Sequence, residues 1–270
     1  MPYIPINGVN IYYEIKGRQD FPEAVVFLNG IMSSVRGWDL QVPVFAKAGY
    51  KILLHDFRGQ LLSGKPAGPY TFTRHALDLK ELLDQIKTEK IHIIGTSYGA
   101  LVGMRFAIDF PHYVKSLTMI DALSETDETF RWIADAWLET LKDRDMAKLF
   151  RAAVPAIYSN SFLEKNEKSL REREALLGKV PPDFIEALTQ LLKNTVTNAG
   201  FTAELINIKC PVLLAVGEYD QLTPLKFSRL IQKQIPHAEL LIVPDCGHTT
   251  IYEKPDIVNT MTLGFISKNI

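Results

Sequence analysis

The chain has 270 residues, of which 47% are hydrophobic and 23% are charged, a mixture typical of a globular protein with ample material for a core. Lysine and arginine number 30 and aspartate and glutamate 31, and this balance argues against nucleic acid or an anionic membrane as a partner. No basic segment followed by an apolar stretch opens the sequence, and no apolar run approaches the roughly 18 residues of a membrane span. We therefore expect a soluble, cytoplasmic protein with one large domain, or one domain with an insertion.

The first half of the chain alternates predicted strands and helices. Short apolar runs, typical of strands, cover residues 9–15, 24–28, 51–55, 91–94 and 114–121. Residues 76–86 and 100–107 lie between these runs and have the apolar spacing of helices. This order predicts an α/β fold with a mostly parallel, doubly wound sheet.

The pattern changes in residues 124–206, where two helical stripes occur without any strand candidate. At residue 211 the alternation resumes, with helices predicted at 221–234 and 252–267. A pair of ordinary crossover helices is the alternative, but such a crossover needs far fewer residues. We expect a helical cap at 124–206, inserted into a core made of residues 1–123 and 207–270.

The sequence Gly-Thr-Ser-Tyr-Gly at residues 95–99 lies directly between a predicted strand and a predicted helix. In such a sharp turn the serine is lifted out of the sheet, and the N-terminus of the next helix points at it. Only small residues tolerate the crowding two positions before and after the serine. This context predicts Ser97 to be a nucleophile, whereas the alternative is a surface turn with an ordinary serine.

A serine hydroxyl needs a base, and a histidine base needs a carboxylate to hold its tautomer. Of six histidines, only His248 follows a predicted strand on a glycine-bearing loop, at the sheet edge where Ser97 is expected. Two aspartates that follow strands compete as its carboxylate partner. We favour Asp220 over Asp121, because Asp220 gives the chain order Ser, Asp, His.

An oxyanion formed at Ser97 would need preorganised N–H donors. We expect the backbone N–H of Tyr98, at the helix N-terminus, and that of Ile31, in the loop after residues 24–28, to supply them. The alternative for that loop is a simple strand-to-helix turn. Met32 in this loop and Trp132 in the insertion are the candidates for substrate contact, because Trp132 lies off the apolar stripe that holds Trp137.

With these residues in place, the chain resembles the α/β-hydrolase family, in its cap-bearing branch of carboxylesterases, enol-lactonases and carbon–carbon bond hydrolases. The resemblance covers residues 8–268 and rests on the segments 28–30, 56–63, 95–99, 217–224 and 247–255. A serine at position 97 argues against the dehalogenase and epoxide-hydrolase branches, which have aspartate there. Two departures are Asn29, where similar members commonly have histidine, and residues 60–62, where the family usually has His-Gly-x.

The resemblance implies a serine hydrolase of a small, largely apolar ester or lactone, with no metal or organic cofactor. Ser97 would attack, His248 would relay the proton and Asp220 would orient His248. Two alternatives remain open. One is a ligand-binding signalling protein that keeps the hydrolase fold with slow turnover, and the other is a hydrolase of a carbon–carbon bond in a diketone.

Overall fold

A computed structural model describes residues 2–21, 23–177 and 180–269. In these ranges eight strands form one sheet in the order β1-β2-β4-β3-β5-β6-β7-β8. β1 and β2 are antiparallel to their neighbours, and the pairs from β4 to β8 are parallel. The strands are β1 (Tyr3–Ile6), β2 (Val9–Gly17), β3 (Glu23–Leu28), β4 (Lys51–His55), β5 (Lys90–Thr96), β6 (Val114–Ile120), β7 (Val212–Gly217) and β8 (Glu239–Val243). The predicted α/β fold with a mostly parallel sheet is confirmed.

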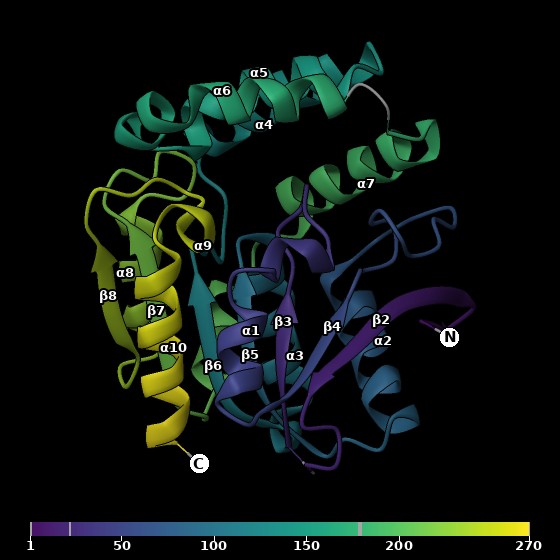
Figure 1. Ribbon diagram of the computed structural model, residues 1–270, viewed down its shortest axis with the longest axis vertical. Helices are drawn as coiled ribbons and strands as arrows, with labels where there is room; N and C mark the ends of the chain where they lie inside the picture. The colour runs from purple at the N-terminus through teal and green to yellow at the C-terminus, as the bar shows by residue number, and fades with distance from the viewer. Residues whose placement is uncertain (1, 22, 178–179, 270) are drawn as a thin grey trace.

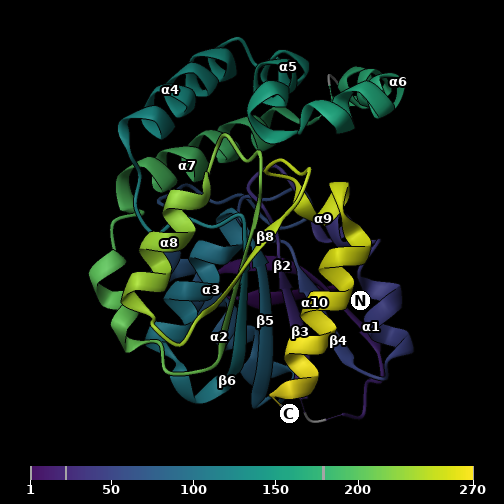
Figure 2. The ribbon, with the colours of Figure 1, turned by 90° about the vertical axis from the view of Figure 1, so that its left-hand side faces the viewer.

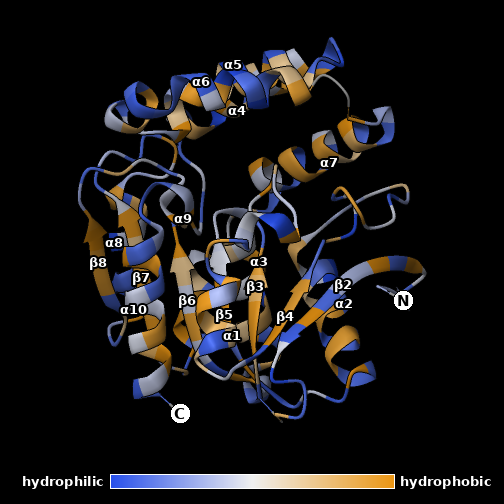
Figure 3. Cartoon of the chain, viewed as in Figure 1, coloured by the Kyte–Doolittle hydropathy of each residue, from blue (hydrophilic) through white to orange (hydrophobic). Residues whose placement is uncertain are grey.

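Helices cover both faces of the sheet (Figure 2). α1 (Val42–Lys47) and α10 (Pro255–Lys268) lie on one face, and α2 (Phe72–Gln85), α3 (Tyr98–Asp109) and α8 (Leu225–Gln234) lie on the other. The central strands are therefore buried on both sides, which explains why their sequences are continuous apolar runs rather than alternating ones. Figure 3 shows β3 and β4 largely in the colour of hydrophobic residues.

Four helices follow β6 and lie beyond the carboxyl ends of the strands (Figure 1). They are α4 (Glu128–Lys142), α5 (Met146–Ile157), α6 (Asn160–Leu177) and α7 (Pro182–Asn198). The two ends of this segment meet, because Glu125 forms a β-bridge with Gly200 and the Ser124 hydroxyl lies 2.9 Å from that of Thr202. The helices are thus joined to the rest of the chain where these two ends meet, and hydrogen bonds such as those of Ser159 with Glu253 and Asn194 with Tyr98 also hold them over the sheet edge.

Several helix boundaries differ from those predicted; α2, for example, begins at Phe72 rather than at residue 76. α8 begins at Leu225 rather than at residue 221, because the Asp220 carboxylate accepts hydrogen bonds from the next backbone N–H groups and holds a turn there. The predicted helix at 252–267 is divided into α9 (Thr250–Glu253) and α10, with Pro255 at the first turn of α10.

Short 3₁₀ helices occupy Val35–Trp38, Pro111–Tyr113 and Thr202–Asn207. Across the described ranges, no helix has both the length and the apolar character that a bilayer crossing needs.

Candidate active site

Ser97 occupies a strained turn between β5 and α3. Its backbone has φ 52° and ψ −116°, a region that residues other than glycine rarely adopt. A Cβ atom added to Gly99 would approach the Leu28 carbonyl oxygen to 2.1 Å, and one added to Gly95 would approach the Gly99 oxygen to 2.6 Å. The crowding explains both glycines of the motif, and the turn presents the Ser97 side chain at the carboxyl edge of the sheet.

Ser97, His248 and Asp220 form a continuous chain of hydrogen bonds, although they come from three separate loops. The Ser97 Oγ lies 3.0 Å from His248 Nε2, and His248 Nδ1 lies 2.9 Å from Asp220 Oδ2. His248 and Asp220 are buried, whereas Ser97 is partly exposed. With the Nδ1 proton directed at the carboxylate, Nε2 is free to accept the serine proton, which is the arrangement that nucleophilic catalysis requires.

The Asp220 carboxylate is fixed from several sides. Its Oδ1 accepts hydrogen bonds from the N–H groups of Leu222 (2.9 Å) and Thr223 (2.8 Å), and its Oδ2 accepts one from the Thr223 hydroxyl (2.7 Å). The same hydroxyl lies 3.0 Å from His248 Nδ1. Thr223 is a site residue that the sequence reasoning missed, although a hydroxyl residue three positions after the aspartate is a visible signal.

The environment favours the protonated form of His248. Burial lowers the pKa of this imidazole, but the charge of Asp220 and its hydrogen bond outweigh burial, so the pKa lies above its ordinary value. Of the other histidines, His55, His75 and His92 are buried and their pKa values are lowered, to about 4, 3 and 4, mainly by burial. These three are therefore neutral at neutral pH.

Asp121 is a second buried carboxylate beside this chain of hydrogen bonds. Its Oδ1 accepts from the Thr250 hydroxyl (2.8 Å) and the Gly217 N–H (3.1 Å), and its Oδ2 accepts from the Thr250 N–H (3.2 Å). Burial, and then the charge of Asp220, raise the pKa of Asp121. Asp121 thus anchors the loop that carries His248, whereas Asp220 is the aspartate that contacts the imidazole.

The residues of this site that could bind a metal ion already take part in hydrogen bonds. Asp121, Asp220 and His248 offer ligand atoms within 4.8 Å of one another. However, each of their carboxylate oxygens accepts at least one hydrogen bond from the surrounding N–H and O–H groups. The arrangement is that of a proton-transfer chain rather than of an open ligand set.

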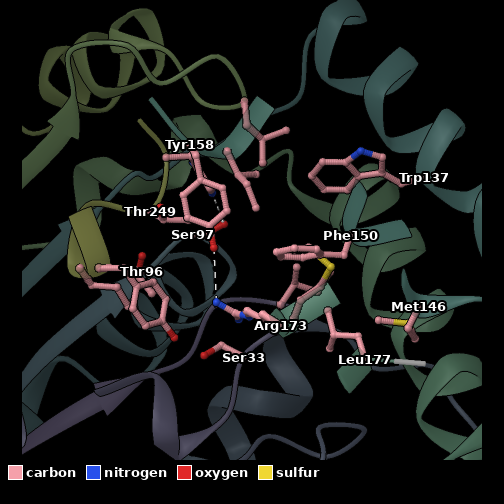
Figure 4. A pocket seen from close by; sticks show the side chains of 18 of the residues that line it. Ser33, Thr96, Ser97, Trp137, Met146, Phe150, Tyr158, Arg173, Leu177 and Thr249 are labelled. Atoms are coloured by element: carbon pink, nitrogen blue, oxygen red, sulfur yellow. Dashed lines mark hydrogen bonds between the residues drawn. The ribbon is translucent and has the colours of Figure 1, made fainter. Parts of the chain in front are cut away.

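A largely apolar pocket opens beside Ser97, between the sheet edge and helices α4 to α7 (Figure 4). Ile31 and Met32 line it, as do Ser97 and His248. Its apolar walls also include Leu61, Trp137, Met146, Phe150, Ile157, Leu177, Val180, Phe184, Leu222 and Ile251. Such walls suit a small substrate with a hydrophobic body.

Trp132, predicted as a substrate contact, is not among the residues that line this pocket. Trp132 is 75% exposed and lies outside this pocket, whereas Trp137 lines it. The physical reason is that the apolar face of α4 turns toward both the core and the pocket, so the tryptophan on that stripe reaches the pocket. Trp132, which lies off the stripe, faces solvent.

Comparisons with known proteins agree with this geometry. A family model described as the alpha/beta hydrolase fold matches residues 23–255. The chain belongs to the α/β-hydrolase family. It is 29% identical to a protein of Azorhizobium caulinodans provisionally named carbamate hydrolase RutD, with 98% of both chains covered. It is 24% identical to 3-oxoadipate enol-lactonase 2 of Acinetobacter baylyi, with 93% of this chain and 91% of that protein covered.

Among solved structures, the chain is similar to MGS-M2, an alpha/beta hydrolase enzyme from a deep-sea metagenome library of the Medee basin. The TM-score is 0.93 at 31% sequence identity, and the alignment covers 98% of this chain and 97% of that one. The similarity therefore extends over the helices α4 to α7 as well as over the sheet.

The two departures from the usual α/β-hydrolase motifs are in contact with each other. The buried Asn29 donates from Nδ2 to Gln60 Oε1 (3.0 Å) and accepts at Oδ1 from Trp38 Nε1 (3.0 Å). Gln60 Nε2 in turn donates to the Gly30 carbonyl oxygen at 2.9 Å. In a trans peptide the C=O and the following N–H point in opposite directions, so this bond turns the Ile31 N–H away from Gln60. The pair therefore fixes the orientation of the peptide predicted to bind an oxyanion.

Proposed function

We propose that this α/β hydrolase cleaves a carboxylic ester or lactone of a small, largely apolar substrate through an acyl-enzyme on Ser97. The observation that carries the proposal is the hydrogen-bond chain from Ser97 Oγ through His248 to Asp220, which ends in an apolar pocket. Residues 124–206 would serve as the cap that closes this pocket. The relatives named as an enol-lactonase and a carbamate hydrolase support acyl transfer as the general chemistry.

In the first half of the reaction, Ser97 Oγ attacks the substrate carbonyl while His248 Nε2 takes its proton. Asp220 keeps the Nδ1 proton directed at its own carboxylate and stabilises the imidazolium that forms. The tetrahedral oxyanion is bound by the N–H groups of Tyr98 and Ile31. Tyr98 opens α3, where an N–H has no partner within its own helix and the helix dipole is positive.

In the second half, His248 gives its proton to the leaving alcohol, and the acyl group stays on Ser97. Water then attacks the acyl carbon while His248 Nε2 takes a proton from the water. The bond from that carbon to Ser97 Oγ breaks, His248 returns the proton to Ser97 Oγ, and the acid is released. The strained turn at Ser97 contributes by holding the hydroxyl in place before the substrate arrives, so little reorganisation is needed during attack.

A panel of chromogenic esters, lactones and carbamates of matched acyl size tests the proposal. We expect turnover of apolar short-chain esters or lactones at about 1–10³ per second. We expect slower turnover of carbamates, because nitrogen donates electron density to the carbonyl. Efficient cleavage of carbamates alone, or turnover only of diketones, would contradict an ester or lactone hydrolase. Tight binding of the esters with negligible turnover would favour the signalling alternative.

The pH dependence of kcat/KM should show an acid limb controlled by His248. The base must be neutral to accept a proton, so activity falls as the pH drops through the pKa of the free enzyme's imidazole. Because that pKa is raised above its ordinary 6.5, the half-maximal point should lie above pH 6.5. Circular dichroism at each pH separates loss of activity from unfolding. A half-maximal point clearly below pH 6.5 would contradict the assignment of His248.

A further inference from the structure

Among the described residues that line the pocket, Arg173 of α6 supplies the single lysine or arginine side chain, and no aspartate or glutamate lines it. Figure 4 shows Arg173 beside Phe150 and reaching toward the hydroxyl of Tyr158. The residue is exposed, so a ligand that enters from solvent can reach its guanidinium. A permanent positive charge is thus placed in a cavity whose walls are otherwise largely apolar.

Aromatic side chains hold the guanidinium of Arg173 in place, and these contacts leave most of its N–H donors unused. It lies 5.6 Å from the ring centre of Phe150 and 5.7 Å from that of Tyr252, distances at which cation–π attraction operates. Its Nη1 donates to the Tyr158 hydroxyl at 3.3 Å, and the Tyr158 ring is stacked on Phe162. Since a guanidinium has about five N–H donors, the others remain available.

The other arginines of the segment from α4 to α7 have acidic partners. Arg131 pairs with Glu128, Arg144 with Glu186, and Arg151 and Arg171 both pair with Glu174. In the described ranges, Arg173 has no carboxylate oxygen within 4.0 Å. Its neighbour Glu174 is engaged by the other two arginines. The charge of Arg173 is therefore not neutralised by the protein.

We propose that Arg173 binds a carboxylate of the substrate, at the end remote from the bond that Ser97 cleaves. This inference rests on the proposed hydrolysis at Ser97 and narrows its substrates to half-esters of dicarboxylic acids, or lactones that carry an acid group. A guanidinium matches a carboxylate with two parallel hydrogen bonds, whereas a carboxylate placed against the apolar walls would be desolvated without a partner. The apolar part of the substrate, between its carboxylate and the bond that Ser97 cleaves, packs against the hydrophobic walls.

Paired substrates test the proposal. The p-nitrophenyl monoester of adipic acid carries a carboxylate, and its methyl ester has nearly the same shape without the charge. The ratio of their kcat/KM values should fall about tenfold or more in Arg173→Met, because a charge-assisted pair is lost. Arg171→Met, which removes the same charge from the same helix outside the pocket, should keep the ratio within about twofold, since a solvated charge is screened. Equal losses for both esters in Arg173→Met would overturn the proposal.

A binding measurement without turnover separates this proposal from the proposed hydrolysis. By calorimetry, Ser97→Ala should bind the monomethyl adipate anion more tightly than dimethyl adipate, and Ser97→Ala with Arg173→Met should lose this preference. If the wild type cleaves neither ester but the preference for the anion depends on Arg173, the result supports the carboxylate subsite and contradicts the proposed hydrolysis. If the preference is absent, or survives without Arg173, the subsite is overturned. Thermal melts establish that each variant is folded.

Discussion

Replacement of Ser97 by alanine should reduce kcat/KM for the preferred ester by about 10⁴- to 10⁶-fold, the scale of losses seen when a catalytic serine is removed. The hydroxyl forms the bond to the substrate, and no other group can replace it at the end of the chain through His248 and Asp220. Because alanine is smaller and the turn is unchanged, substrate binding should persist. Steady-state kinetics on purified variant, with thermal unfolding as the check on folding, gives the result.

A matched control is Ser33→Ala, which removes a hydroxyl from another residue that lines the pocket but does not contact His248. Its effect should be small compared with that of Ser97→Ala. Activity of Ser97→Ala within tenfold of the wild type would show that the nucleophile is a different group. This result would contradict the proposed acyl-enzyme on Ser97.

Replacement of Asp220 by asparagine should lower kcat by about 10⁴-fold while leaving the fold intact. The amide can present an N–H to His248 Nδ1, which favours the tautomer whose proton sits on Nε2 and blocks acceptance of the serine proton. The carboxylate now lies 2.9 Å from Nδ1 and is also held by Thr223. The measurement is kcat on the same ester, with the acid limb of the pH profile recorded alongside.

Asp121→Asn separates the two aspartates. Asp121 bonds Thr250 and Gly217 rather than the imidazole, so its loss should cost stability, about 1–3 kcal/mol for an unsatisfied buried group, more than activity. A larger loss of kcat in folded Asp121→Asn than in folded Asp220→Asn would transfer the orienting role to Asp121.

Most of the fold could be predicted from the sequence because its signals are local. Runs such as those of β3 and β4 are apolar throughout, since helices cover both of their faces, and the alternation of strands and helices implies a parallel sheet. The start of α8 could not be predicted, because it depends on a turn that the Asp220 side chain holds through hydrogen bonds. Helical periodicity carries no information on such bonds.

At the site, residues that end strands were accessible to prediction, because the carboxyl ends of parallel strands meet at one edge. Ser97, His248 and Asp220 all follow strands, and the structure brings them together. Arg173 was not predicted as a pocket residue, and Trp137 was assigned to the buried stripe of its helix in preference to the pocket. Their positions depend on how α4 and α6 pack over the sheet, and a helical stripe does not distinguish a face that meets the core from one that also borders a cavity.

The two departures from the family motifs are a second case in which a tertiary contact could not be predicted from the sequence. Asn29 and Gln60 each differ from the family pattern, and from the sequence each is a separate irregularity. In the folded chain they form one hydrogen-bonded unit that orients the peptide between Gly30 and Ile31. Only this contact in the folded chain shows that Gln60 is the hydrogen-bond partner of Asn29.

Labelling with a small alkyl fluorophosphonate, read by intact-protein and peptide mass spectrometry, tests most directly that Ser97 is the activated nucleophile. Ser97 Oγ displaces fluoride from the phosphorus centre, and the phosphonate ester that forms is a stable, tetrahedral mimic of the intermediate. The account predicts one equivalent of label on the peptide that contains Ser97, with loss of esterase activity in step and no label in Ser97→Ala. Full activity with Ser97 unlabelled, or inactivation by label on another residue, would contradict it.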